Sequence, residues 1–445
     1  MVTRFFKVES RGSTPLREFQ AGLTTFAAMA YILAVNPSIL ANTGMDRGAL
    51  VTVTALTAAV ATALMAFFTN YPIAMAPGMG INAFFTFTIC LAKGVPWNEA
   101  LGMVFVNGII FLSLSVTGVR EKIIASIPLG LKIAVTCGVG LFIAFIGLKN
   151  GGVIAGNAAT FVGPGDFTAG PAKLCLAGIV LTALLVARKV PGAIVLGILA
   201  ITVVGLFTSN GAGGRITDLS AGIFSYPHSA SPIFLKLTFG FLTSWTKFQT
   251  ALPLIFTLLL VDMFDNIGTL IGVTKRAGLL DADGRLPNAG RALLADSIAT
   301  ILSALSGTST VVSYIESASG VEAGGRTGLT ALWVAFFMLA ALFLTPLILA
   351  IPPCATAPAL VIVGIFMMQS VVEIDMITFE TAAPAVITIF MIPLTFSIAK
   401  GIGMGLISYA LLSIFLGRAK QFPVIGYVVA VVFFCSFFKI WPFRG

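Results

Sequence analysis

Charged residues are scarce in this sequence, because Asp, Glu, Lys and Arg together make up 10% of its 445 residues. Soluble domains carry roughly 25% charged residues, so the composition excludes a chain built of ordinary water-soluble domains. Hydrophobic residues make up 58%, and apolar runs close to the ~20 residues that cross a bilayer recur along the chain. The sequence therefore predicts an all-α polytopic membrane protein. Clear apolar runs are 22–41, 49–68, 98–119, 327–350, 357–372 and 421–440.

Residues that bind metals or act as nucleophiles are also few. His228 is the single histidine and lies in a semi-polar stretch, so it is not expected to relay protons. The five cysteines are scattered without paired spacing, which indicates packing residues rather than a disulfide framework or a metal site. With no metal cluster and no nucleophile beside a base, the sequence predicts neither enzyme activity nor a cofactor. The cysteines are Cys90, Cys137, Cys175, Cys354 and Cys435.

The net charge of +9 reflects the loops of a membrane protein and does not indicate nucleic-acid binding. Basic residues concentrate in short loops, and such loops face the cytoplasm in membrane proteins. Because four basic residues precede the first apolar run, the sequence predicts a cytoplasmic N-terminus. The predicted location is the cytoplasmic membrane, crossed many times. The four residues are Arg4, Lys7, Arg11 and Arg17.

About fourteen apolar segments can be counted, and whether a further stretch at 421–440 crosses the membrane stays open. The stretch 208–247 is semi-polar and is expected at the membrane interface. Two segments depart from the apolar pattern, namely APGMGINAFFTF around residue 80 and SGTSTVVSYIESASG around residue 314. Both are rich in small residues that weaken a helix. Non-helical backbone at membrane depth must be buried in protein or line a wet cavity.

The two breaks lie at matching distances from the starts of the first and eighth apolar segments, near Gly22 and Ala251. A shift of seven segments maps one break onto the other, and an odd shift inverts the second copy. Interrupted segments at matching places in two inverted halves mark the binding site of many secondary transporters. The spacing therefore predicts an inverted repeat with its site at the breaks.

Three acids in apolar surroundings are the strongest candidates for a functional role. Asp262 and Asp265 share one side of a helix in VDMFDNIGTLIGV, and Thr269 continues that stripe. Glu316 stands in the second break with no basic neighbour before Arg326. Acids inside a membrane are costly and mark functional sites. Carboxyls without a fixed cation can exchange a proton, favour neutral, donor-rich or cationic ligands, and repel inorganic anions.

Further candidates come from the first break and from another apolar run. Asn82 is the polar residue of the first break, and its amide can both donate to and accept from a heterocycle. Phe84 can stack on a flat ring, with plain packing as the alternative. Asp296, in RALLADSIAT, either bonds the backbone of a broken segment or belongs to a proton path. For the paired aspartates the alternatives are a basic partner on a neighbouring helix or a place at a helix end.

Four ordered motifs resemble the signature segments of the AzgA-like purine permeases. These permeases form a branch of the nucleobase–cation symporter-2 (nucleobase–ascorbate transporter) superfamily. The similarity extends over essentially the whole chain. The motifs are GLTTFAAMAYILAVNP (22–37), APGMGINAFF (76–85), VDMFDNIGTLIGV (261–273) and TSTVVSYIESASGVEAGGRTGLTA (308–331).

The resemblance implies about fourteen transmembrane segments in a seven-plus-seven inverted repeat, with short extended breaks in segments 3 and 10. Segments 1–4 and 8–11 are expected to form a core domain, and the others a gate domain. The implied boundaries are 1–21 for a cytoplasmic N-terminal segment, 22–130 and 248–350 for the two parts of the core, and 131–247 and 351–445 for the two parts of the gate.

The resemblance also implies a proton-coupled symporter that imports purine nucleobases by alternating access, with H⁺ as the coupling ion and no cofactor. Asp265 and Glu316 are the implied proton-coupling residues, and Asp296, which was singled out above from its apolar run, is predicted to join them. Related members are homodimers, so a homodimer is expected. The implied substrate-binding residues are Thr25, Asn82, Phe84, Asp262, Asp265, Thr269, Tyr314 and Glu316.

The substrate stays open within this reading. Some adenine-preferring relatives lack an acid at the position of Asp262, so adenine, guanine and hypoxanthine are all plausible. The alternatives are a transporter of the same fold for uracil, xanthine or an inorganic anion, and a passive channel.

Overall fold

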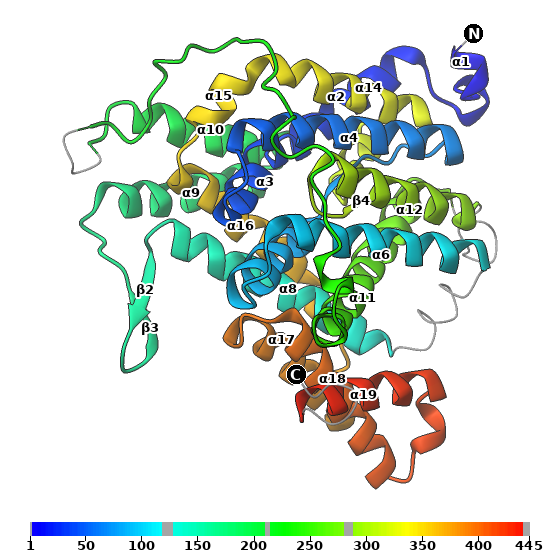
Figure 1. Ribbon diagram of the computed structural model, residues 1–445. Coiled ribbons are helices and arrows are strands. Elements are labelled where there is room, and N and C mark those ends of the chain that lie inside the picture. Colours follow the sequence, from blue (N-terminus) through cyan, green and yellow to red (C-terminus); the bar gives the residue numbers. More distant parts are fainter. Residues whose placement is uncertain (1, 118–127, 210–213, 280–287, 439–445) are drawn as a thin grey trace.

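The computed structural model describes residues 2–117, 128–209, 214–279 and 288–438, and these are predominantly helical (Figure 1). Ten helices within these ranges are long and apolar enough to cross a membrane. The predicted all-α polytopic class is confirmed at this level. The ten are Pro15–Thr43, Arg47–Thr69, Trp97–Thr117, Leu129–Asn150, Gly170–Ala187, Trp245–Met263, Ala289–Ser306, Gly328–Ala350, Pro353–Glu373 and Ile398–Phe415, and the shorter apolar helices are Met79–Ala92, Ala193–Gly205, Phe379–Leu394 and Gly426–Cys435.

The helices pack in two groups (Figure 1). In the first helix group, α14 packs against α2 and α4, α12 packs against α4 and α6, and α11 packs against α6. The members of this group are α2 (Pro15–Met29), α3 (Ile32–Leu40), α4 (Arg47–Thr69), α6 (Trp97–Thr117), α11 (Trp245–Arg276), α12 (Ala289–Ser306), α14 (Gly328–Ala340) and α15 (Thr345–Ala350).

In the second helix group, α16 packs against α8, α9 and α10, and α17 packs against α8 and α18. Small residues permit the closest crossing: a Cβ atom added at Gly140 would lie 2.8 Å from the carbonyl oxygen of Gly364. Close backbone approach through small residues is the usual way that membrane helices associate. The members are α8 (Leu129–Asn150), α9 (Gly170–Ala187), α10 (Ala193–Gly205), α16 (Pro353–Met368), α17 (Phe379–Leu394) and α18 (Ile398–Phe415).

Local sequence signals set the helix starts. Thr14 precedes α2, and its hydroxyl accepts a hydrogen bond from the N–H of Arg17 at 3.3 Å. Asp46 caps α4 in the same way, accepting from the N–H of Ala49 at 2.7 Å. Such side chains satisfy N–H groups that have no partner inside the first helical turn.

A buried carboxylate joins two helices of the first helix group. Glu18 is fully buried on α2 and accepts from the N–H groups of Arg326, Thr327 and Thr330 at 3.1–3.3 Å. The hydroxyls of both threonines also donate to it, at 2.8 and 2.6 Å. These bonds join α2 to the start of α14. The preceding segment carries the short helix α1 (Val2–Phe5) and the turn Glu9–Arg11.

The long stretch before α11 runs along the ends of first-group helices as irregular chain. The carbonyl of His228 accepts from the hydroxyl of Thr52 on α4 at 2.8 Å, and the N–H of Leu235 donates to Leu305 on α12 at 2.8 Å. In residues 214–244 the helical turn is Gly240–Leu242. Residues 214–244 therefore contain no membrane-spanning helix, and α11 begins at Trp245. The strands β2 (Ile154–Asn157) and β3 (Phe161–Pro164) form a separate exposed hairpin.

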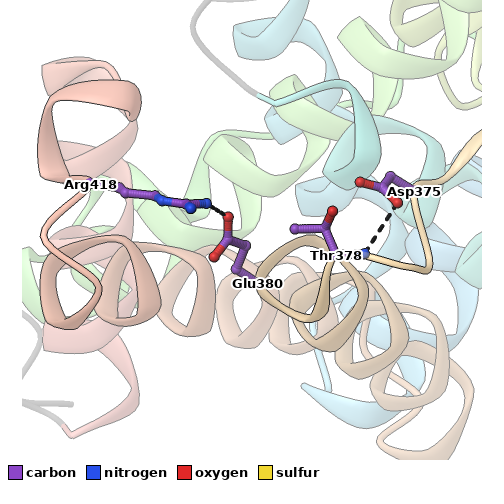
Figure 2. Close-up of polar contacts among 4 residues, drawn as sticks. All are labelled: Asp375, Thr378, Glu380 and Arg418. Carbon is purple, nitrogen blue, oxygen red and sulfur yellow. Dashed lines mark hydrogen bonds and ion pairs between the residues drawn. The ribbon is translucent and has the colours of Figure 1, made fainter.

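The C-terminal part adds α19 (Val424–Phe437), which packs on α18. Its 14 residues leave open whether the stretch 421–440 crosses a membrane. Figure 2 shows Arg418, which follows α18, paired with Glu380 at the start of α17. In the turn before α17, the side chain and backbone of Thr378 bond Asp375 and hold the pKa of that carboxyl below its usual range.

Candidate functional site

The two predicted breaks meet in a buried two-stranded antiparallel sheet. Strand β1 (Met75–Pro77) pairs with β4 (Val311–Ser313), with Met75 opposite Ser313 and Pro77 opposite Val311. The N–H of Tyr314 donates to Ala74 O at 2.9 Å, and that of Gly78 to Thr310 O at 3.0 Å. Because two strands satisfy one another inside the helix bundle, extended backbone is tolerated at this depth. The prediction of two breaks is confirmed.

A short helix follows each strand. After β1 comes α5 (Met79–Ala83), which continues as a π-helix over Phe84–Ala92. After β4 comes α13 (Ser317–Glu322), which packs against α2. Each broken segment thus consists of one short strand followed by one short helix.

Glu316 lies between β4 and α13, half-buried, and Tyr31 is its side-chain partner. The hydroxyl of Tyr31 donates to Glu316 Oε1 at 2.5 Å. Tyr31 stands between α2 and α3 and is 2% exposed. Within the described part of the chain, no Lys or Arg side chain pairs with Glu316. The carboxyl is therefore held by a neutral donor, as the absence of basic neighbours in the sequence suggested.

Thr25 lies on α2 where that helix touches α13. A Cβ atom added at Gly320 would overlap the Thr25 hydroxyl and lie 2.7 Å from Ala21 O, so glycine permits this contact. Thr25 is buried, and its Oγ1 has no hydrogen-bond partner among the described residues. The structure thus brings Thr25, Tyr31 and Glu316 to one interface.

Asn82 and Phe84 are fully buried beside the first strand. The hydroxyl of Ser309, which precedes β4, donates to Asn82 Oδ1, so the two breaks are also joined by side chains. Asn82 Nδ2 has no partner among the described residues. Phe84 has 0% exposure, so it is packed on every side in this conformation. Its role in stacking on a base stays a prediction.

Tyr314, predicted to contact substrate, bonds the first strand through its hydroxyl, and its substrate contact stays a prediction. The hydroxyl donates to the carbonyl of Pro77 at 2.7 Å, and the side chain is 5% exposed. Pro77 has no N–H group to donate to a neighbouring strand. The bond from Tyr314 to the Pro77 carbonyl is therefore an additional link between β1 and the second break.

Asp262 lies on α11 and is fully buried. Asn107 on α6 donates its amide to Asp262 Oδ2 at 3.4 Å. One turn further along α11, Asn266 Oδ1 accepts from the N–H of Ser313 on β4 at 3.3 Å. This face of α11 therefore points to α6 and to the paired strands. Thr269 is half-buried on the same helix.

The two other predicted proton-coupling residues, Asp265 and Asp296, lie on α11 and α12. The side chain of Asp265 lies outside the described residues. Asp296 is fully buried on α12, next to Ser297, whose hydroxyl is 3.2 Å from that of Ser115 on α6. Ser297 thus faces α6, while α12 also packs against β4.

Three residues at this site went unpredicted: Tyr31, Asn107 and Asn266. Each is a polar side chain inside an otherwise apolar run, the same signal that singled out the aspartates. A neutral amide or phenol is less costly in a membrane than an acid, so the signal is weaker. Among the described residues, no group of three His, Cys, Asp or Glu side chains could hold a metal ion.

Comparison with known proteins decides the family. A model described as "Permease family" matches residues 16–404. The chain belongs to this family. It is 41% identical to the guanine/hypoxanthine permease PbuG of Bacillus subtilis, over 97% of this chain and 98% of that protein. It is 40% identical to the adenine permease AdeP of Escherichia coli, over 97% and 95%.

These matches confirm the resemblance to the AzgA-like purine permeases, and the protein is a multi-pass membrane permease rather than an enzyme. The transmembrane domain of the cyanobacterial bicarbonate transporter BicA has a similar structure, with a TM-score of 0.61 over 87% of this chain and 96% of that one. At 14% identity this similarity shows a shared transporter fold.

Proposed function

We propose that this permease is a proton-coupled symporter that imports purine nucleobases, with adenine, guanine and hypoxanthine as candidate substrates. The named relatives support the substrate class, since their names assign adenine to one and guanine and hypoxanthine to the other. The cytoplasmic membrane is the proposed location.

The observation that carries this proposal is the half-buried carboxyl of Glu316 at the junction of two paired breaks, bonded by the phenol of Tyr31. A carboxylate oxygen can accept from several donors, so one phenol leaves acceptor capacity for the N–H groups of a purine. A carboxylate repels inorganic anions, which disfavours a bicarbonate-like substrate. Asn82, whose Nδ2 has no partner among the described residues, supplies a complementary donor from the other break.

Proton coupling is assigned to acids that lie in apolar helices or in the second break. A carboxylate inside a membrane is costly, and binding a proton lowers that cost. Glu316, Asp265 and Asp296 are therefore the proposed coupling residues, and Asp262 is grouped with the substrate-binding ones. If the proton and the purine base both interact with the same carboxyl group, each stabilises the protein form in which the other is bound.

Alternating access is assigned to the two helix groups. We take the first helix group with β1, α5, β4 and α13 as the core (22–130 and 248–350), and the second as the gate (131–247 and 351–445). With this division we propose a seven-plus-seven inverted repeat and a cytoplasmic N-terminus. Substrate and proton shift the equilibrium between the inward-facing and outward-facing states only if they bind the two states with different affinities. A homodimer remains the expected assembly.

The test is uptake of radiolabelled adenine, guanine, hypoxanthine and uracil into proteoliposomes, with and without an imposed pH gradient. A symporter should accumulate a purine with the gradient and lose that accumulation when a protonophore collapses it. Uptake that is insensitive to the gradient would indicate a passive channel, and uptake of uracil or bicarbonate alone would remove the purine assignment.

A further inference from the structure

The first membrane segment is interrupted next to Glu316. Helix α2 ends at Met29 and α3 begins at Ile32, with Ala30 and Tyr31 between them. The N–H of Leu33 donates to Ala30 O, three residues back, at 3.1 Å, whereas an α-helix bonds four residues back. Ala30 and Tyr31 keep right-handed helical dihedral angles, so the interruption is one tighter turn, and Tyr31 reaches Glu316 from it.

Tyr31 approaches Glu316 from the protein side. Its side chain is 2% exposed, whereas Glu316 is half-buried and the preceding Ile315 is 44% exposed. The Tyr31 hydroxyl donates a hydrogen bond to Oε1 of Glu316. The carboxylate keeps acceptor capacity on its more accessible side.

A second contact fixes the register of the two elements. Gly320 on α13 packs against Thr25 and Ala21 on α2, with no room for a Cβ atom. Glu316 precedes α13 directly, and its carbonyl accepts from the hydroxyl of Ser319 at 2.6 Å. The backbone around Glu316 is thus held on one side by α2 and on the other by its own helix start.

We propose that Tyr31 is a positioning residue for substrate recognition: from behind, it holds Oε1 of Glu316 so that the rest of the carboxylate faces the N–H groups of the base. This inference rests on the proposed function. The carboxyl of Glu316 has three rotatable bonds, so its orientation in a partly accessible site needs such a partner. Without the phenol, the carboxylate of Glu316 becomes ordered only when the base binds. The affinity for the base is then lower, because binding includes the cost of ordering this side chain.

The decisive variant is Tyr31→Phe, which removes the hydroxyl and keeps the ring. Purified protein in nanodiscs should bind the transported purine with a dissociation constant about 10-fold higher, because the carboxylate is no longer held by the phenol before the base arrives. Tyr71→Phe is the matched control. Tyr71 is also 2% exposed, and its hydroxyl has no partner among the described residues. This control should bind like the wild type.

Infrared difference spectroscopy separates positioning from a general structural defect. The carboxyl band that Glu316→Gln removes should shift in Tyr31→Phe and stay unshifted in Tyr71→Phe. In the Glu316→Gln background, Tyr31→Phe should cause no further loss of binding, because the two changes remove one interaction.

Wild-type affinity in Tyr31→Phe together with an unshifted band would overturn the inference. Additive losses in the double variant would assign Tyr31 a role independent of Glu316 and would also overturn it. If the wild type binds no purine, the proposed function fails and purine positioning fails with it. The infrared band would still decide whether Tyr31 holds Glu316.

Discussion

Asn107 on α6 donates its side-chain amide to Asp262 on α11 across 3.4 Å, and both side chains are fully buried. An acid in the middle of a membrane helix therefore has a neutral amide beside it. A neutral partner satisfies one oxygen whether or not the acid carries a proton, which a fixed cation would not permit equally well.

Replacing Asn107 by leucine should lower the stability of the folded protein. The change removes a donor from a buried carboxyl, which costs about 1–3 kcal/mol. Thermal unfolding of the detergent-solubilised variant, followed by size-exclusion chromatography, should show a lower midpoint. Asn42→Ala is the control, because Asn42 is exposed and bonds its own helix end. An unchanged midpoint for Asn107→Leu would mean that the amide contributes nothing to stability.

Glu316→Gln should abolish pH-dependent purine uptake while the protein stays in the membrane. An amide of the same shape cannot exchange a proton near neutral pH, although it can still accept a hydrogen bond. Asp265→Asn is expected to have the same effect. Uptake into proteoliposomes under an imposed pH gradient measures both. Glu373→Gln, at an exposed position, should transport normally. Normal accumulation by Glu316→Gln would exclude this residue from coupling.

Gly320→Ala should reduce uptake at least about 10-fold. The added methyl group would overlap Thr25 and press on Ala21 O at 2.7 Å, so α13 must move away from α2 and carry Glu316 with it. Gly290→Ala is the matched control, since a Cβ atom there meets nothing within 4 Å and Gly290 lies at the start of α12. Alanine is the better helix former, so this control should be neutral or slightly stabilising. Equal uptake by both variants would contradict the close contact.

Glu18→Ala should destabilise the protein without changing the purine affinity of the folded fraction. Three backbone N–H groups and two hydroxyls lose their acceptor, and the loss should amount to about 3 kcal/mol or more. Expression level and the thermal midpoint report the stability, and binding is measured on the monodisperse peak. Glu9→Ala, which removes an exposed carboxyl, should match the wild type. A changed affinity with an unchanged midpoint would instead assign Glu18 to the site.

Local sequence sufficed for the membrane class and the positions of the two breaks. Hydropathy over ~20 residues reports a membrane span because the bilayer itself selects such runs. A carboxyl such as Glu316 stands out in the sequence because its cost in a membrane does not depend on its partner. The family followed from four motifs, and comparison with known proteins confirmed it.

Tertiary structure alone decided the partners. Tyr31 and Glu316 are 285 residues apart, and no local pattern links a phenol in the first segment to an acid in the second break. The pairing of Met75 with Ser313, the amide beside Asp262 and the full burial of Phe84 likewise depend on which helices pack together. Hydropathy is a sum over neighbours in the chain, whereas a hydrogen bond requires two atoms at one place, and packing of the whole bundle determines that place.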